Sequence, residues 1–389
     1  MKNFIFFTTL SLVLSFLLFT NNPLHKDFSN SNFILNKKNE ENKYIFHTRY
    51  FTKDKEDKTA SLHSHSSSLT HTKKGNMLVF FAGTREGATD VAIYQIFLDD
   101  LNSMKNPKKI LDSSMLSDMS SKFIKKLGNP VVFTDLNGKT HLFVVGVSLG
   151  GWATSKIYHL TFDEKVEKLS YKEELKLGFM ANLSHLVRNN AVLMQDNLLK
   201  QSGFILPIYH ELARKYPLLA YFDEEGKFLY AKRINSLKNQ LQPSMTVLNE
   251  KEILLSFRNY NTYDNTLFLQ KCDINAKCEK PFETGLKNYD SANLLFSFYQ
   301  DKKLHTFLIQ NKSDDEKNRR KELVIYALNG KKLCEIYTLD KSQEISYPSV
   351  LIENSMLYTS YTYDRVKIGL NILPLIFLAQ ANLKDKPCF

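Results

Sequence analysis

The chain of 389 residues has only four cysteines, one tryptophan and no repeated metal-ligand spacing. Four cysteines are too few for a fold built on disulfides. No Cys-x-x-Cys or His-x-x-x-His pair occurs, so we expect no structural zinc, no other metal and no cofactor. The 52 Lys and Arg outnumber the 41 Asp and Glu, but they are scattered, with no basic helix or zinc-finger spacing. These absences argue against a nucleic-acid-binding protein.

Long hydrophobic runs are also scarce. The one run of membrane-spanning length covers residues 4–20, follows a single positive charge, and is typical of a secretory signal or a short signal-anchor. It lacks small residues at its end for cleavage and is at the lower limit of length for crossing a bilayer. We therefore expect residues 1–22 to be an uncleaved anchor or, nearly equally, a cleaved signal. Residues 23–43 would be a linker, and the body would lie in the periplasm or cell envelope, touching the membrane through the N-terminal segment only.

An exported chain can form disulfides. Cys272 and Cys278 flank a hairpin-like loop and could close a small ring. Cys334 and Cys388 are either a second bridge or two free thiols. The sequence does not choose between these alternatives, nor does it indicate an oligomeric state.

Short strands separated by turns dominate the rest of the chain. Runs rich in β-branched and aromatic residues cover residues 77–82, 91–97, 142–147, 253–257 and 304–309. A weak repeat of a turn glycine followed by a strand recurs at Gly75, Gly138, Gly226 and Gly330. About 320 residues of such units, with four strands per blade, fit an all-β domain over residues 44–389, a six-bladed β-propeller. The best helical signals are short, at 117–126 and 208–215.

Several motifs resemble, in the same order along the chain, those of the sialidase superfamily. They are LHSHSSSL at 62–69, FFAGTREG at 80–87, LGNP at 127–130, SLGGW at 148–152, LVR at 186–188, LPIYHE at 206–211, LQPS at 241–244, NYDS at 288–291, YPS at 347–349 and YTYDR at 361–365. They are most similar to the BNR-repeat branch of predicted neuraminidases. The Ser-x-Asp-x-Gly-x-Thr-Trp box of the superfamily is intact nowhere, and residues 135–140 are its best remnant. The resemblance implies a sialidase-like propeller whose loops build one shallow site on one face.

The resemblance also implies roles for residues in that site. Sialidases bind the carboxylate of the sugar with arginines, which pair with carboxylates in a two-pronged geometry. Arg258 matches one member of this triad, and Arg319 or Arg320 matches another. Tyr347 matches the tyrosine nucleophile that replaces the usual carboxylate in sialidases. Asp90 is the candidate acid/base.

Two positions depart from the sialidase pattern. His65, or else His63, stands where sialidases carry the first arginine of the triad. Gln242 stands where they carry the glutamate that activates the tyrosine, and an amide cannot take up a proton. Acidic residues that could replace this glutamate in space are Glu211, Glu344 and Glu86, of which Glu211 is our catalytic candidate. The remaining candidates for substrate binding are Arg85, Arg188 and Arg365.

Each candidate also has a purely structural interpretation. Arg85 can form a surface ion pair with its neighbour Glu86, and such pairs contribute little. Tyr347 can be a packed aromatic side chain, and the two histidines can be hydrogen-bonded structural residues. Trp152 can be a platform for a sugar ring or a plug between two blades.

The leading hypothesis is an exported, membrane-tethered glycoside hydrolase of exo-α-sialidase type that acts on a terminal acidic sugar of a glycan. One alternative is a propeller that binds carbohydrate without cleaving it, which Gln242 and the missing arginine favour. Another is a uronic-acid lyase or glycosidase that transfers protons through His63 or His65 with Tyr209 and His210.

Overall fold

The computed structural model describes residues 27–35, 47–51, 63–99, 106–178, 182–196, 202–313 and 315–389. The expected signal or anchor at residues 1–22 lies outside the described residues. Within the described ranges, no helix is both long and apolar enough to cross a bilayer.

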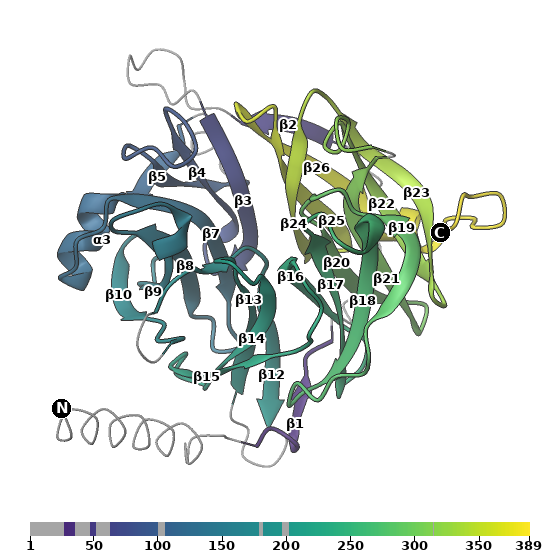
Figure 1. Ribbon diagram of the computed structural model, residues 1–389, viewed down its shortest axis with the longest axis horizontal. Coiled ribbons are helices and arrows are strands. Elements are labelled where there is room, and N and C mark those ends of the chain that lie inside the picture. The colour runs from purple at the N-terminus through teal and green to yellow at the C-terminus, as the bar shows by residue number, and fades with distance from the viewer. Residues whose placement is uncertain are drawn as a thin grey trace, which may run out of the picture.

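Six antiparallel sheets follow one another around a central axis, which confirms the all-β six-bladed propeller (Figure 1). Blade 1 comprises β3 (His63–Thr72), β4 (Gly75–Gly83), β5 (Ala92–Phe97) and β6 (Lys108–Leu111). Blade 2 comprises β7 (Lys126–Thr134), β8 (Thr140–Val147), β9 (Lys156–Phe162) and β10 (Leu169–Glu174). Blade 3 comprises β11 (His185–Val187), β12 (Val192–Asp196), β13 (Ser202–His210), β14 (Tyr216–Phe222) and β15 (Phe228–Arg233). Blade 4 comprises β16 (Gln240–Val247), β17 (Glu252–Asn259), β18 (Thr266–Asp273) and β19 (Phe282–Lys287). Blade 5 comprises β20 (Leu294–Gln300), β21 (Lys303–Lys312), β22 (Glu322–Asn329) and β23 (Lys332–Lys341). Blade 6 contains β24 (Ile345–Glu353), β25 (Met356–Tyr363) and β26 (Lys367–Pro374).

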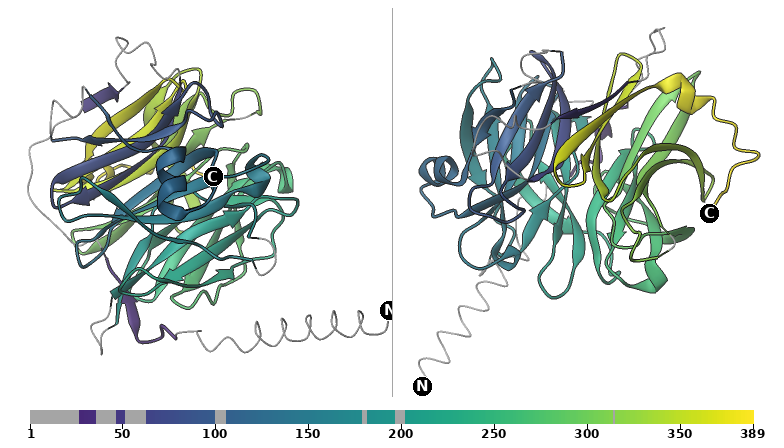
Figure 2. Two further views of the ribbon diagram at one scale, coloured as in Figure 1. Left: turned by 90° about the vertical axis from the view of Figure 1, so that its left-hand side faces the viewer. Right: turned by 90° about the horizontal axis from the view of Figure 1, so that it is seen from above.

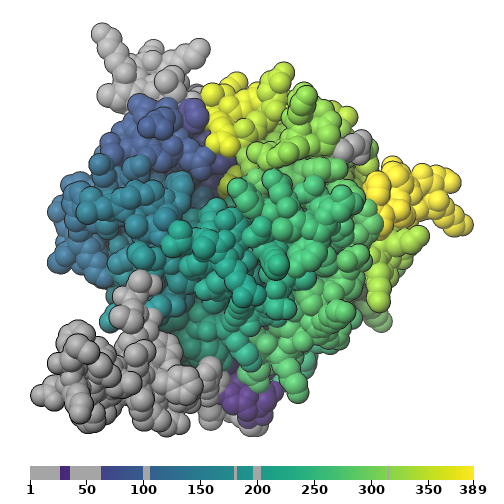
Figure 3. All heavy atoms as spheres, in the orientation of Figure 1, coloured from purple at the N-terminus to yellow at the C-terminus, as the bar shows by residue number. Residues whose placement is uncertain are grey.

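Two N-terminal strands join blades that are distant in sequence. The short β2 (His47–Phe51) pairs with β26 and completes blade 6, so the two ends of the chain close the ring. Figure 3 shows the blue N-terminal part meeting the yellow C-terminal part at the surface. The strand β1 (Ser31–Phe33) pairs with β12 of blade 3. These three residues fall in the stretch expected to be a linker, yet Phe33 is buried because it packs between blades 3 and 4.

The hydrophobic core lies between the blades. Strand β4 shows the principle, because successive side chains of a strand point to opposite faces. Met77, Val79 and Phe81 pack against blade 2, whereas Leu78 and Phe80 pack against blade 6. Both faces are buried, which explains why the sequence of β4 is a continuous apolar run. Equivalent clusters fill the other interfaces between neighbouring blades.

The described α-helices are short, and each contributes at least one buried leucine to a core cluster. The helix α3 (Ser113–Ser120) begins at the N-cap Asp112, whose side chain accepts the Met115 backbone N–H. In Figure 2 it faces the viewer in the left view and lies at the left edge in the right view. It overlaps the expected helix at 117–126 but starts and ends earlier. The expected helix at 208–215 is wrong, because Ile208 to His210 end β13 and pair with β14 across a tight hairpin. Within the described ranges, the other α-helix is α4 (Leu375–Ala379).

The ring that Cys272 and Cys278 could close forms, and of the two alternatives for Cys334 and Cys388 the structure has the bridge. Cys272 is bonded to Cys278 across the turn after β18, and Cys334 of β23 is bonded to Cys388 in the C-terminal tail. The backbone of Leu333 exchanges two hydrogen bonds with Phe389, at 2.9 and 3.0 Å, so the tail is fixed along blade 5.

Candidate active site

Residues from all six blades meet in one polar cavity of about 200 Å³. In each blade, the loop between the second and third strands opens on the face where the inner strand begins, because the strands alternate in direction. These loops and strand ends supply the lining, which consists of Glu86, Asn129, Trp152, Leu186, Tyr209, Glu211, Gln242, Arg258, Arg320, Tyr347 and Arg365. Guanidinium, carboxyl, phenol and amide groups therefore face the same space.

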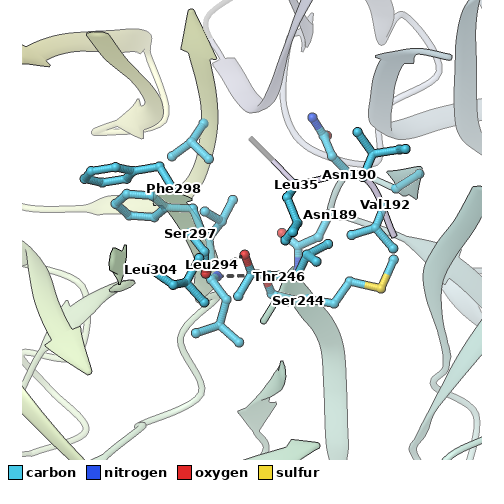
Figure 4. Close-up of a pocket in the computed structure, with 17 residues that line it drawn as sticks. Leu35, Asn189, Asn190, Val192, Ser244, Thr246, Leu294, Ser297, Phe298 and Leu304 are labelled. Carbon is cyan, nitrogen blue, oxygen red and sulfur yellow. Dashed lines mark hydrogen bonds between the residues drawn. The ribbon is translucent and has the colours of Figure 1, made fainter. Parts of the chain in front are cut away.

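A second cavity lies farther along the inner strands, where Ser244 follows Gln242 in β16, and its lining differs in chemistry from that of the polar cavity. It has a volume of about 170 Å³, and Figure 4 shows Leu35, Val192, Leu294 and Phe298 among the residues around it. No ionisable side chain lines this cavity. Of these two cavities, only the polar one has side chains for general acid–base or anion chemistry.

A recurring distortion of the inner strands places side chains in the polar cavity. Blades 2, 4 and 6 each have a β-bulge near the start of the inner strand, at Asn129, Gln242 and Tyr347. All three residues have positive φ, of 39°, 44° and 59°, and each precedes a proline. Positive φ costs energy for residues other than glycine, so the surrounding structure has to hold each of these three residues in this conformation. A bulge redirects a side chain, and here it turns all three toward the axis.

Tyr347 is surrounded by cations and hydrogen-bond donors. Its side chain is buried, and its hydroxyl accepts hydrogen bonds from Arg258 Nη1 at 3.2 Å and from Gln242 Nε2 at 3.4 Å. The guanidinium carbon of Arg188 lies 4.9 Å from the ring centroid, and that of Arg320 lies 5.9 Å away. These groups stabilise negative charge that develops on the phenolic oxygen.

Three arginines line the cavity, and each is held by a carboxylate. Arg258 Nε donates to Asp290 at 2.7 Å. Burial alone would lower the pKa of Arg258, but Tyr347 and Asp290 raise it above its usual value. Arg320 and Arg365 donate to opposite oxygens of Glu344, at 3.1 and 2.8 Å. The hydrogen bonds to Glu344 thus fix the guanidinium groups of Arg320 and Arg365 side by side, an arrangement suited to binding an anion.

Glu211 differs from the other acidic residue of the lining. Glu86 accepts a hydrogen bond from Arg365 at 2.6 Å, whereas no described side chain forms a hydrogen bond or ion pair with the Glu211 carboxyl. Burial raises the pKa of Glu211, and the more distant Arg258 and Lys215 only partly oppose this. A carboxyl group whose pKa is raised by burial holds its proton to higher pH than an ordinary glutamate, which suits a general acid.

Two of the predicted binding residues lie behind Tyr347 rather than in the cavity. Arg188 is buried and donates to the backbone oxygens of Ser67 and Pro348. Burial lowers the pKa of Arg188 to about 10, although Tyr347 and Tyr209 partly oppose the effect. His65 is fully buried, and its ring centroid lies 4.3 Å from that of Tyr347. Burial, followed by the charge of nearby arginines, holds the pKa of His65 well below its usual value, so it is neutral.

Asp90 and Arg85 are not brought to the cavity. The Asp90 carboxylate is exposed and accepts hydrogen bonds from the backbone N–H and the hydroxyl of Thr84, both at 2.9 Å. It shapes the loop between β4 and β5, whereas Arg85 points outward and the next residue, Glu86, lines the cavity. Of the residues named for the alternative proton-transfer route, Tyr209 lines the cavity, whereas His63, His65 and His210 do not.

Two lining residues, Leu186 and Asn129, lie in the sialidase-like motifs but were not candidates for the site. The signal for Asn129 is the X-Pro step near the start of an inner strand, which recurs at Gln242 and Tyr347. Trp152 also lines the cavity and lies against Gly128, where an added Cβ would be 2.8 Å from the indole. Within the described ranges, no three His, Cys, Asp or Glu side chains are grouped as metal ligands would be.

Comparison with solved structures agrees with this fold. The chain resembles a Hadza microbial sialidase with a TM-score of 0.63 and 11% identity, over 81% of this chain and 66% of that one. It resembles the Trypanosoma rangeli sialidase in complex with the inhibitor DANA with a TM-score of 0.59 and 10% identity, over 90% and 60%. A Penicillium chrysogenum α-L-arabinanase complexed with arabinobiose gives 0.60 and 9%, over 88% and 100%. The chain thus spans at most about two thirds of these two sialidases.

No curated protein shows significant sequence similarity to the chain. A family model does match, and it covers residues 75–359, which include every inner strand except β3 and all the residues that line the cavity apart from Arg365. The chain therefore belongs to the BNR repeat-like domain family.

Proposed function

We propose that the protein is a glycoside hydrolase of exo-sialidase type that removes a terminal acidic sugar from a glycan. One observation carries this proposal. The Tyr347 hydroxyl, three guanidinium groups and the unpaired carboxyl of Glu211 face the same cavity. This combination supplies a nucleophile, an anion-binding group and a proton donor, which are the three components that hydrolysis of such a glycoside needs.

In the proposed reaction, Arg258, Arg320 and Arg365 bind the carboxylate of the sugar. The Tyr347 oxygen attacks the anomeric carbon while its proton passes to water in the cavity. The electron pair of the glycosidic bond goes to the leaving oxygen, which takes the proton of Glu211. The Glu211 carboxylate then accepts a proton from the water that attacks the glycosyl-tyrosine. The Tyr347 oxygen leaves and regains a proton from solvent, so both residues return to their starting state.

Tyr347 is activated in this scheme without a neighbouring base. Gln242 cannot accept the phenolic proton, but its amide and Arg258 both donate to the phenolic oxygen. Donors arranged in advance around an oxygen that becomes negative stabilise the transition state. The positive charge of Arg188 and Arg320 near the ring acts in the same direction.

The test is hydrolysis of aryl α-sialosides and aryl uronides by the wild type and by Tyr347→Phe. We expect release of the aryl alcohol from at least one acidic glycoside, and a loss of about 10³-fold or more in the variant. A carbohydrate-binding propeller without activity is the second candidate, favoured by Gln242 in place of a base. Binding of acidic glycans with no turnover of any glycoside would select it over the hydrolase.

We further propose that the protein works outside the cytoplasm. The disulfides Cys272–Cys278 and Cys334–Cys388 support this location, because such bonds persist in oxidising compartments. Fractionation of cells that express the full chain tests it, and recovery of a fully reduced protein from the cytoplasm would contradict it.

A further inference from the structure

A larger cavity adjoins the proposed active site. It has a volume of about 430 Å³ and lies between the β21–β22 loop of blade 5 and the loops that flank β24 and β25 in blade 6. Its lining consists of Glu316, Lys317, Arg319, Arg320, Gln343, Glu344 and Arg365. Arg320 and Arg365 line both cavities, so they form a wall that the two spaces share.

Glu344 holds this wall in place. Its two carboxylate oxygens accept hydrogen bonds from Arg320 and Arg365, and it lines the larger cavity but not the smaller one. Arg320 Nη2 also donates to the backbone oxygen of Asp290 at 3.2 Å, while its Nε is buried without a partner. The wall is therefore rigid, and it retains a donor that no described residue satisfies.

The larger cavity has more positive than negative charge. Four cationic side chains line it, against the two carboxylates of Glu316 and Glu344. Lys317 is exposed and forms no ion pair with any described residue. Arg319 has only long contacts to carboxylates, 3.4 Å to Asp290 and 3.5 Å to Glu316. Lys317 and Arg319 are thus the two cations of this lining without a short ion pair to a described carboxylate.

We propose that the larger cavity is a second anion subsite, which binds an anionic group on the sugar next to the one that is cleaved. This inference rests on the proposed function, because it takes the smaller cavity as the place of the terminal acidic sugar. The substrate class is then a glycan in which a terminal acidic sugar is linked to another anionic sugar. Lys317 and Arg319 bind the second anion, and the shared wall of Arg320 and Arg365 faces both.

The experiment compares glycans with one and two anionic groups. The Tyr347→Phe protein is used for binding, so that no substrate is consumed. Its dissociation constants are measured for sialyllactose, disialyllactose and sialyllactose sulfated on galactose, and for mono- and digalacturonic acid. The same set is measured after adding Lys317→Ala alone, or Lys317→Ala with Arg319→Gln. Lys332→Ala is the matched control, because Lys332 is an exposed lysine of the same blade on the β22–β23 turn at the opposite face.

We expect the dianionic member of a pair to bind about fivefold more tightly than the monoanionic one, the effect of exposed charge pairs. Lys317→Ala should remove part of this preference, and the double variant should abolish it while leaving monoanionic binding unchanged. Comparing disialyllactose and digalacturonic acid, which carry a second carboxylate, with the sulfated sialyllactose shows which second anion is preferred. Equal binding of both members by the parent protein, or equal weakening of both by the variants, overturns the second subsite and leaves the proposed function standing. Failure to bind every acidic glycan overturns both.

Discussion

Replacement of Glu211 by Gln tests the assignment of the general acid. The amide keeps the size of the side chain but cannot donate a proton to the leaving oxygen. General acid catalysis contributes about 10²- to 10⁴-fold, which corresponds to about 3–5 kcal/mol of transition-state stabilisation. We expect a loss of this size for a glycan, whose alcohol leaving group needs protonation. For an aryl glycoside, kcat/KM should fall no more than about tenfold, because this constant reports the first step and a phenolate departs without a proton.

The pH dependence gives a second and independent readout. Because burial raises the pKa of Glu211, the wild type should lose activity as pH rises through that raised value, where the proton is lost. Folding stability follows the same sign, since a carboxyl with a raised pKa favours the folded state at low pH and loses that contribution as pH rises. Glu211→Gln should lack this limb in both profiles. The measurement is kcat/KM on an aryl glycoside and an acidic glycan between pH 4 and 9.

Asp90→Asn is the matched control, because Asp90 is an acidic residue of a loop on the same face that only holds Thr84. The amide oxygen can still accept from the Thr84 backbone, so we expect little change in kcat/KM. Equal losses on both substrates for Glu211→Gln would refute the acid role. So would a profile in which Asp90→Asn, and not Glu211→Gln, removes the alkaline limb.

Three further predictions concern the site, the blade interface and the tail. Arg258→Lys keeps the positive charge, but a lysine cannot contact Asp290 and Tyr347 at the same time, as the guanidinium does. We therefore expect kcat/KM to fall about 100-fold while the melting curve stays unchanged. An unchanged kcat/KM would contradict the proposed role of Arg258. Burial lowers the pKa of His159 to about 4 in the folded protein. As the pH falls below about 6.5, the histidine therefore takes up a proton in the unfolded chain but not in the folded one, and this favours unfolding. The free energy of unfolding in urea should therefore fall by about 2 kcal/mol between pH 7 and pH 4.5, and by less in His159→Gln. The same pH dependence in both proteins would contradict this. Replacing both Cys334 and Cys388 by Ser should lower the free energy of unfolding by about 2–4 kcal/mol, again measured in urea, and no loss would mean that the tail contributes nothing.

Strand positions could be predicted from the sequence because both faces of most strands are buried. The turn glycines, however, did not mark equivalent places in the blades. Gly75 and Gly138 follow inner strands, whereas Gly226 and Gly330 lie between third and fourth strands. Both kinds of turn lie on the face opposite the cavity, so the repeat is a hairpin and not a blade. The pairing of β2 with β26 joins the ends of the domain, and no local pattern encodes such a contact.

The cavity was predicted in part. Tyr347, Gln242, Arg258 and Arg320 reach it, as the family motifs implied, and so does Arg365. These residues lie at bulges or loop ends, where short motifs specify the local backbone.

The remaining assignments depended on contacts far apart in sequence. Arg188 is drawn behind Tyr347 by the carbonyl groups of two inner strands, which the local sequence does not show. The choice between Asp90 and Glu211 depends on which carboxyl its own loop already satisfies. That information resides in the folded loop and not in the residue type.

The central claim is that Tyr347 is the nucleophile of an acidic-sugar hydrolase, and covalent trapping tests it most directly. The protein is incubated with 2,3-difluorosialic acid and with a fluorinated uronosyl fluoride, and is then digested for mass spectrometry. We predict a glycosyl adduct on the peptide that contains Tyr347, and none in Tyr347→Phe. An adduct on Glu211, or an active wild type that never forms an adduct on Tyr347, would contradict the account.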